Sequence, residues 1–230
     1  MRLWDTATGE SRLLRGHSSW VISVAFAPDG RHIAAGATDG SIRVWSFPDG
    51  ESRVISGHSS PVRTLAFAGP DRLVSADLSG QVRDTELATG SGRALADGTA
   101  GRSATMAVSP RGDLVAWVDS EGDVQLWSRR AGQARAIDSG DQTIEVLVFA
   151  PDGRTLVGHG YGDRVLVWDA ATGAPMTLHS YGRTVSDAAI APNGLSIATA
   201  ESDGTVRLWP FDLPYEPGRL RAWLRLSGAE

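Results

Sequence analysis

The sequence contains no cysteine and no lysine. Without cysteine the chain has no disulfide, no thiolate zinc site and no cysteine nucleophile. All 22 basic residues are arginine, a bias more typical of a GC-rich genome than of a phosphate-binding site. Aromatic residues make up only 7% of the chain, although the apolar fraction of 41% is enough to bury a core.

Long runs of basic or apolar residues are also missing. The net charge of −5 is spread along the chain, and the longest basic run is Arg129–Arg130. Nucleic acids and anionic membranes would require a clustered positive surface, so neither is an expected partner. No stretch approaches 18 apolar residues, and the first ten residues, MRLWDTATGE, show no signal peptide. We therefore expect a soluble cytoplasmic protein.

Nearly the same heptapeptide occurs twice, as DGSIRVW over 39–45 and as DGTVRLW over 203–209. The tryptophan that ends it recurs at intervals of 40 to 42 residues, with Thr85 in one slot. These positions are Trp4, Trp45, Thr85, Trp127, Trp168 and Trp209. The pattern predicts a structural repeat of about 41 residues.

Each repeat has the same internal order of strands and turns. A Gly-His pair (Gly16-His17, Gly57-His58) precedes a strand with a proline-containing turn such as APDG. A second strand leads into an Asp-Gly-like turn, a third strand ends at the tryptophan, and a D-x-x-T-G turn leads to a fourth. Short segments rich in Val, Ile and Leu between such turns predict antiparallel hairpins. Four strands per repeat predict an all-β propeller.

The Gly-His, Asp-Gly and Trp-Asp elements (Trp4-Asp5, Trp168-Asp169) resemble those of the WD-repeat family over residues 1 to about 210. The resemblance implies a WD-repeat β-propeller of about five blades plus a two-strand N-terminal stub. We expect the partial blade to cover 1–14, full blades to cover 15–56, 57–97, 98–138 and 139–179, and a three-strand last blade to cover 180–210. Residues 211–230 are predicted to form a tail with a short helix that caps the last blade or recognises another domain.

The family resemblance further implies a hydrogen-bonded tetrad of His, Ser or Thr, Asp and Trp within each blade. Buried indole and imidazole N–H groups need such partners. No blade of this chain has all four residues, and the second has Ser79 in place of the turn aspartate and Thr85 in place of the tryptophan. The remnants are His17, Asp39, Trp45, His58, Ser75, Trp127, Trp168, Thr199, Asp203 and Trp209.

The strand count leaves the closure of the ring open. In one interpretation the chain is the C-terminal part of a longer protein, and earlier blades complete the ring. In the other it closes alone as a small or irregular ring, or with a second copy through its open strand edges. Unpaired strand edges favour dimerisation or aggregation.

By resemblance to the family, the residues around the start of each first strand lie on the upper face, around the central channel. Aromatic and arginine side chains are common anchors of protein interfaces. The predicted protein-docking surface consists of Trp20, Arg63, Arg102 and Glu145. The alternative for Trp20 is that it packs on the neighbouring blade.

Sequence patterns for other kinds of site are missing. There is no His-x-x-x-His metal spacing, no D-x-D-x-D-G calcium loop and no Gly-x-Ser-x-Gly elbow, so we expect no metal, cofactor or catalytic residue. His159 in GHGYGD is interpreted as part of a degenerate turn, with a ligand-binding loop as the alternative.

The predicted function is a non-catalytic protein–protein interaction scaffold, with a protein or peptide ligand on the upper face. Resemblance to bacterial WD-repeat proteins implies a sensor or regulatory module of a signalling protein, beside a kinase, an NTPase or a caspase-like protease. The alternatives are a hydrolase-like propeller enzyme with a site at the central channel, and a structural homo-oligomer.

Overall fold

The structure, a computed structural model, describes residues 1–47, 49–98, 105–180 and 183–210. These residues are all-β and form 21 antiparallel strands in six sheets. The predicted fold class is therefore confirmed. The helix predicted within 211–230, like Arg102, lies outside the described residues. Within them, no helix is long and apolar enough to span a membrane.

The strands follow one another from sheet to sheet along the chain. The first sheet has two strands, β1 (Arg2–Trp4) and β2 (Ser11–Leu13). Four sheets of four strands follow: β3 (Val21–Phe26), β4 (His32–Ala37), β5 (Ile42–Ser46) and β6 (Ser52–Ile55); β7 (Val62–Phe67), β8 (Arg72–Asp77), β9 (Gln81–Glu86) and β10 (Gly92–Asp97); β11 (Met106–Val108), β12 (Leu114–Val118), β13 (Val124–Ser128) and β14 (Gln133–Ile137); β15 (Val146–Phe149), β16 (Thr155–His159), β17 (Arg164–Asp169) and β18 (Pro175–His179). The last sheet has three strands, β19 (Val185–Ile190), β20 (Ser196–Glu201) and β21 (Val206–Pro210).

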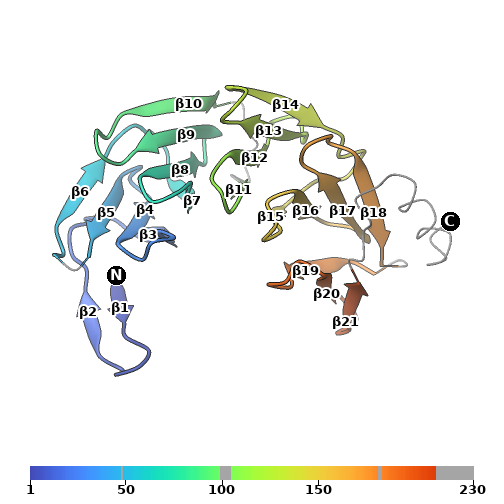
Figure 1. Cartoon of the computed structure of the whole chain (residues 1–230), viewed down its shortest axis with the longest axis horizontal. Helices are drawn as coiled ribbons and strands as arrows, with labels where there is room; N and C mark the ends of the chain where they lie inside the picture. The colour runs from blue at the N-terminus through green and yellow to red at the C-terminus, as the bar shows by residue number, and fades with distance from the viewer. Residues whose placement is uncertain (48, 99–104, 181–182, 211–230) are drawn as a thin grey trace.

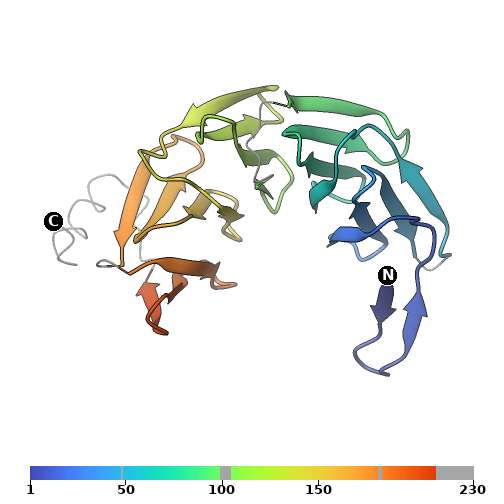
Figure 2. The ribbon, with the colours of Figure 1, turned by 180° about the vertical axis from the view of Figure 1, so that it is seen from behind.

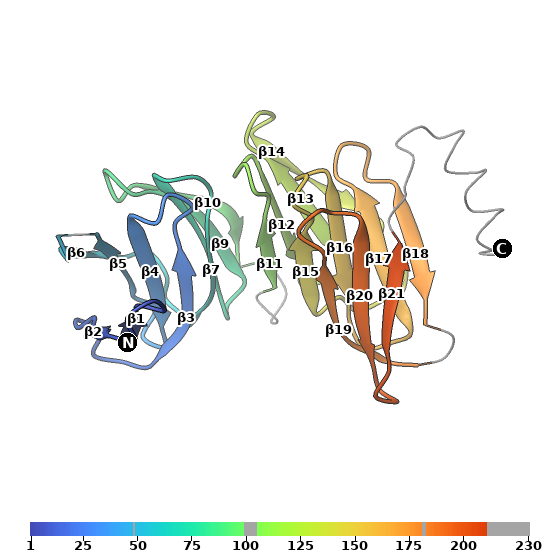
Figure 3. The same cartoon turned by 60° about the horizontal axis from the view of Figure 1, so that its bottom comes forward.

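The sheets stand side by side in an open arc (Figure 1). The first strands of the sheets, β3, β7, β11, β15 and β19, lie along the inner side of the arc, and β6, β10, β14 and β18 lie along its outer side. The view from behind shows the same opening between the hairpin β1–β2 and the sheet β19–β21 (Figure 2). Seen from the edge, neighbouring sheets stack face to face (Figure 3). The arrangement is that of propeller blades around an incomplete ring.

Turn residues allow neighbouring sheets to approach closely. Gly40, in the turn between β4 and β5, has a φ of +81°. A Cβ atom on Gly40 would lie 2.8 Å from the carbonyl oxygen of His58, which precedes the next sheet. Only glycine meets both conditions without strain, so the Asp39-Gly40 turn sets the spacing between two sheets as well as the reversal of the chain.

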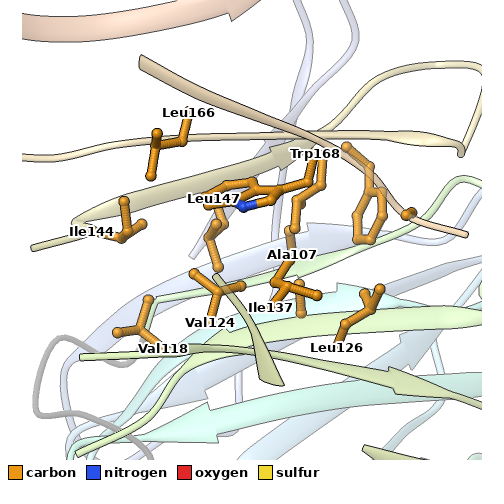
Figure 4. Close-up of a cluster of buried hydrophobic side chains, with 13 residues drawn as sticks. Ala107, Val118, Val124, Leu126, Ile137, Ile144, Leu147, Leu166 and Trp168 are labelled. Atoms are coloured by element: carbon orange, nitrogen blue, oxygen red, sulfur yellow. The ribbon is translucent and has the colours of Figure 1, made fainter. Parts of the chain in front are cut away.

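Side chains pack between sheets, and each interface has its own apolar core. Figure 4 shows the cluster between the sheets β11–β14 and β15–β18, in which the ring of Trp168 faces Leu147, Ala107 and Ile137. Trp168 is fully buried. An aromatic side chain buries about 150–250 Å² and so provides much of the energy of such an interface. Each sheet is therefore stabilised by its neighbours rather than by a single central core.

Candidate functional site

The upper rim is the edge of the arc where the first strands begin and the turns between second and third strands end. Two backbone hydrogen bonds place these segments together. The amide of Thr38 donates to the carbonyl of Trp20 over 2.9 Å, and that of Leu78 donates to the carbonyl of Pro61 over 3.0 Å. The starts of β3 and β7 therefore lie beside the turns β4–β5 and β8–β9.

The structure places Trp20 directly before β3 and Arg63 near the start of the neighbouring strand β7, both at this rim. Trp20 is 82% exposed. Arg63 is exposed, and it makes no ion pair within the described residues. The Ser23 hydroxyl donates to the carbonyl of Val62 over 2.8 Å and holds β3 against β7. An aromatic ring and a guanidinium are thus both accessible at this rim.

Glu145, another predicted docking residue, is held by its backbone. Its amide donates to the carbonyl of His159 over 2.9 Å, and its carbonyl accepts the Thr105 hydroxyl over 2.8 Å. Its side chain is half-buried. Tyr161, which the sequence reasoning passed over as part of a degenerate turn, is 82% exposed in the turn between β16 and β17. The sequence signal for this exposed side chain was an aromatic residue flanked by two glycines.

The most complete polar network lies in the sheet β7–β10. His58 Nδ1 lies 2.9 Å from Asp77 Oδ2, and His58 Nε2 lies 2.7 Å from the Ser75 hydroxyl. Asp77 also accepts the amide and hydroxyl of Ser79 and the amide of Gln81. The aspartate that orients the histidine is therefore at the end of β8, two residues before the position where the sequence pattern expected it.

This network has the hydrogen-bond order of a Ser-His-Asp catalytic triad, but its burial excludes that role. Ser75 is 1% exposed and Asp77 is fully buried, so no substrate can reach the serine. Burial lowers the pKa of His58, and the Asp77 carboxylate offsets this only in part. A neutral imidazole that donates through Nδ1 and accepts through Nε2 satisfies both partners. The network stabilises the sheet.

In the sheet β3–β6 a serine takes over part of the tetrad. Ala35 stands where a hydroxyl is usual, and its carbonyl accepts from His17 Nε2 over 3.2 Å. The Ser41 hydroxyl lies 3.2 Å from His17 Nδ1 and donates to Asp39 over 2.7 Å. The indole of Trp45 donates to the carbonyl of Arg15 over 3.3 Å. The Ser41 side chain thus lies between His17 and Asp39.

The remaining tryptophans have different partners in each sheet. Trp209 donates to the Thr199 hydroxyl over 3.0 Å, as the tetrad pattern predicts. Trp168 donates to the carbonyl of Asp138 over 2.7 Å. The buried Nε1 of Trp127 has no hydrogen-bond partner among the described residues. Asp203 has no histidine partner among the described residues; it accepts from Thr205 and pairs with Arg183 over 3.1 Å.

Comparison with known proteins agrees with this geometry. The family profile named WD domain, G-beta repeat matches residues 9–46 and 175–210. Two segments of the chain therefore match the WD40-repeat family. The first matched segment contains β2 to β5 and the second contains β18 to β21, so each runs from a fourth strand through the three strands of the following sheet, at opposite ends of the arc.

Several proteins that are similar to this chain in sequence are much longer than it. Periodic tryptophan protein 2 of Arabidopsis thaliana is 27% identical over 215 residues, which are 90% of this chain and 24% of that protein. Apoptotic protease-activating factor 1 of Mus musculus is 26% identical over 216 residues, 91% of this chain and 17% of that protein. The Neurospora crassa Periodic tryptophan protein 2 homolog is 35% identical over 111 residues, 45% of this chain and 12% of that protein. The chain thus spans about a quarter or less of each.

Arginines on the fourth strands join successive WD40 sheets on the outer side. Arg53 on β6 donates to the carbonyl of Ala88, and Arg93 on β10 donates to that of Gly132. Arg135 on β14 donates to the carbonyls of Ala170, Ala171 and Thr172 over 2.9 to 3.0 Å. In each case the acceptor is in the turn between third and fourth strands of the following sheet. No sequence pattern for a single sheet predicts this contact.

His159 is the unusual histidine of the described residues. It is 4% exposed, and neither ring nitrogen has a hydrogen-bond partner among the described residues. The nearest carboxylate oxygen, Asp187 Oδ1 on β19, lies 3.9 Å from Nε2. Burial lowers the pKa of His159. Within the described part of the chain, no group of three or more His, Asp or Glu side chains could hold a metal ion.

Proposed function

We propose that this WD40 chain is a non-catalytic interaction module that binds a peptide or protein loop on its upper rim. The observation that carries the proposal is that the upper rim exposes both the indole of Trp20 and the guanidinium of Arg63, which makes no ion pair within the described residues. WD40 repeats commonly bind proteins and are generally non-catalytic. Tryptophan and arginine are the residues most enriched among those that dominate binding energy.

The chemistry of the two anchors favours a ligand with an apolar side chain next to a carboxylate. Trp20 offers an uncovered apolar surface, and Arg63 offers a planar fork that can bind a carboxylate through two hydrogen bonds. Tyr161 extends the exposed aromatic surface to a turn farther along the arc. We therefore propose an acidic, partly apolar peptide segment as the ligand class.

The proposed context is a larger signalling protein in which these repeats form the sensor or regulatory part. The support is that relatives aligned over most of this chain are several times longer. One of them bears the name Apoptotic protease-activating factor 1, which describes a regulator of another protein's activity. A hydrolase-like site in the central channel has no comparable support.

The test uses a phage-displayed peptide library selected against the full chain. Selected peptides are then measured against Trp20→Ala and Arg63→Ala. The control is Val54→Ala, which truncates a half-exposed apolar side chain on β6, on the outer side of the arc. Each rim substitution is expected to weaken binding by about 2 kcal/mol, or about 30-fold.

The pattern of losses decides the outcome. Peptides rich in acidic residues that lose affinity for both rim variants and keep it for Val54→Ala support the proposal. Peptides that bind all three variants equally well, or a selection that yields no binder, would contradict it.

A further inference from the structure

A groove opens at the lower rim between two sheets in the middle of the arc, β11–β14 and β15–β18 (Figure 1). The lower rim is the edge opposite the upper rim, where the turns between first and second strands lie beside the turns between third and fourth strands. In these two sheets the amide of Arg129 donates to the carbonyl of Asp113, and the amide of Ala170 donates to the carbonyl of Arg154. The groove has a volume of about 370 Å³ and is lined by the turns of both sheets. Sites for small molecules have volumes of about 300–1,000 Å³.

The two sheets approach each other less closely at this rim than the preceding pair of sheets does. The difference is seen at the equivalent turn glycines, Gly112 and Gly153. A Cβ atom on Gly112 would lie 2.5 Å from the carbonyl carbon of Ala68 in the preceding sheet. A Cβ atom on Gly153 would have Pro110 Cδ as its nearest contact in the preceding sheet, 3.6 Å away. Apolar side chains, most of them small, line the space that this spacing leaves: Leu114, Ala131, Ala170 and Ala171.

The turn between β11 and β12 carries its charges in the reverse order to the equivalent turns. The sequence PDGR occurs at 28–31 and 151–154, between β3 and β4 and between β15 and β16, whereas PRGD occurs at 110–113. Arg111 therefore stands where the turn on the other side of the groove has Asp152. That turn keeps the arginine of the common order, Arg154. Both walls of the groove consequently carry a guanidinium.

The two carboxylates of the groove are engaged within their own turns, and the two guanidinium groups are not. Asp113 accepts the Ser109 hydroxyl over 2.7 Å. Asp152 accepts two backbone amides and the Thr155 hydroxyl over 2.8 to 3.2 Å. Arg111 and Arg154 are exposed, and neither side chain takes part in an ion pair within the described part of the chain. Both guanidinium groups are therefore available to an anionic ligand.

Other donors of the groove add to this positive surface. Arg135 on β14 is held in one wall by its hydrogen bonds to the carbonyls of residues 170–172. The Ser128 hydroxyl accepts the amide of Ala131 over 3.3 Å, which leaves its own proton for a ligand. Arg130 lies in the same turn and contributes one more positive charge next to the groove. Four arginines thus stand against two aspartates, which leaves a net charge of +2.

We propose that this groove binds a small organic phosphate. A phosphate monoester carries about −1.5 to −2 charges at pH 7 and three acceptor oxygens, so it can accept hydrogen bonds from both walls at once. Its charge matches that of the groove, whereas a carboxylate has a single charge and two oxygens. The organic part then packs on Leu114 and the alanines. The site lies at the rim opposite Trp20 and Arg63, so it goes beyond the proposed function.

The first experiment measures the binding of phenyl phosphate to the full chain by isothermal titration calorimetry at fixed ionic strength. Inorganic phosphate should bind more weakly than phenyl phosphate because it lacks the apolar part. Benzoate should bind at least about 10-fold more weakly than phenyl phosphate, because its single charge and two oxygens cannot engage both walls. Benzoate that binds as tightly as phenyl phosphate overturns the proposal, and so does the absence of binding at millimolar phenyl phosphate.

The second experiment repeats the titration with variants of the groove. Arg111→Gln and Arg154→Gln should each weaken the binding of phenyl phosphate by about 10-fold or more. The matched control is Arg31→Gln, which changes the equivalent arginine of the turn between β3 and β4, outside the groove, and should leave binding unchanged. Ala171→Phe keeps both guanidinium groups but fills the groove, and it should also weaken binding.

Thermal melts check that each variant is folded before its affinity is compared. Unchanged affinity in Arg111→Gln and Arg154→Gln, or in Ala171→Phe, contradicts the proposal. An equal loss in Arg31→Gln does so as well, because it would mean that phenyl phosphate binds to exposed arginines in general.

Discussion

Asp84 is the most informative residue for testing how neighbouring WD40 sheets hold together. It lies on β9 at the position occupied in other sheets by apolar residues such as Val44 and Leu126, and it is 2% exposed. Arg72 binds it through two hydrogen bonds of 3.0 Å, and Arg129 of the next sheet binds it over 2.8 Å. The carboxylate also raises the pKa of Arg72. A buried charge at an apolar position therefore joins two sheets.

The predicted cost of Asp84→Ala is about 3 kcal/mol of unfolding free energy. Hydrogen bonds to charged groups contribute about 1.5–3 kcal/mol each, and three are lost. The total is smaller than their sum, because both guanidinium groups are about 30% exposed and regain water. Asp84→Ala also removes the free-energy cost of burying the carboxylate, which lowers the predicted loss of unfolding free energy further. Arg129 keeps its contact with Trp127, whose ring centre is 5.3 Å away.

The assay is urea unfolding followed by tryptophan fluorescence for Asp84→Ala, Arg129→Ala and the double variant. The double-mutant cycle isolates the Asp84–Arg129 pair across the two sheets, with an expected coupling of about 1–2 kcal/mol. Because the carboxylate is buried, the coupling should persist at high salt. A loss below about 0.5 kcal/mol for Asp84→Ala, or a coupling that salt abolishes, would show that this is only a surface ion pair and refute the reasoning.

Three further predictions concern single positions. Arg135→Met should lower the unfolding free energy by about 1–2 kcal/mol in urea titrations, because three hydrogen bonds to carbonyls are lost. Arg135→Lys should lower it by nearly as much, since an ammonium lacks the planar fork of donors that reaches all three carbonyls. His159→Leu should raise stability by about 1 kcal/mol at pH 7, since it removes buried unpartnered nitrogens. Because burial lowers the pKa of His159, the unfolded chain binds this proton more readily than the folded chain, and the free energy of unfolding falls as the pH drops from about 6.5 to the folded pKa. Above about pH 6.5 His159 adds no pH dependence to stability. Thermal melts between about pH 7 and pH 5 should therefore show His159→Leu losing less stability than the unmodified chain. Gly160→Ala should lower the melting temperature, with a loss of about 1–3 kcal/mol, because its Cβ would overlap the carbonyl oxygen of Thr143.

Much of the fold was predictable because it is encoded locally and repeatedly. The tryptophan spacing, the Asp-Gly and proline turns and the alternation of apolar residues are properties of short segments, and four antiparallel strands per repeat follow from them. Trp20 and Arg63 could be placed on an accessible rim for the same reason: their position depends on where a strand begins. The contact between His58 and Ser75 follows the same repeat pattern.

The network around His58 shows where the local pattern stopped being informative. The sequence pattern assigned the acid's place to the turn, where Ser79 stands, whereas Asp77 fills it from the end of the preceding strand. Two neighbouring positions can direct an oxygen to the same imidazole, and only the folded backbone decides which one does. Trp127 is a similar case, since its indole has guanidinium groups over the ring in place of a hydrogen-bond partner among the described residues.

The sequence by itself determined the repeat, the strands and the turn chemistry of this protein, because each depends on residues within one repeat. The tertiary structure decided the contacts between repeats: the Asp84 ion cluster, the outer arginines, and the groove lined by Arg111 and Arg154. These depend on which sheet lies next to which, and on how closely neighbouring sheets approach. An apolar residue has the same letter whether a neighbouring sheet covers it or not, so its exposure is a property of the assembled arc alone.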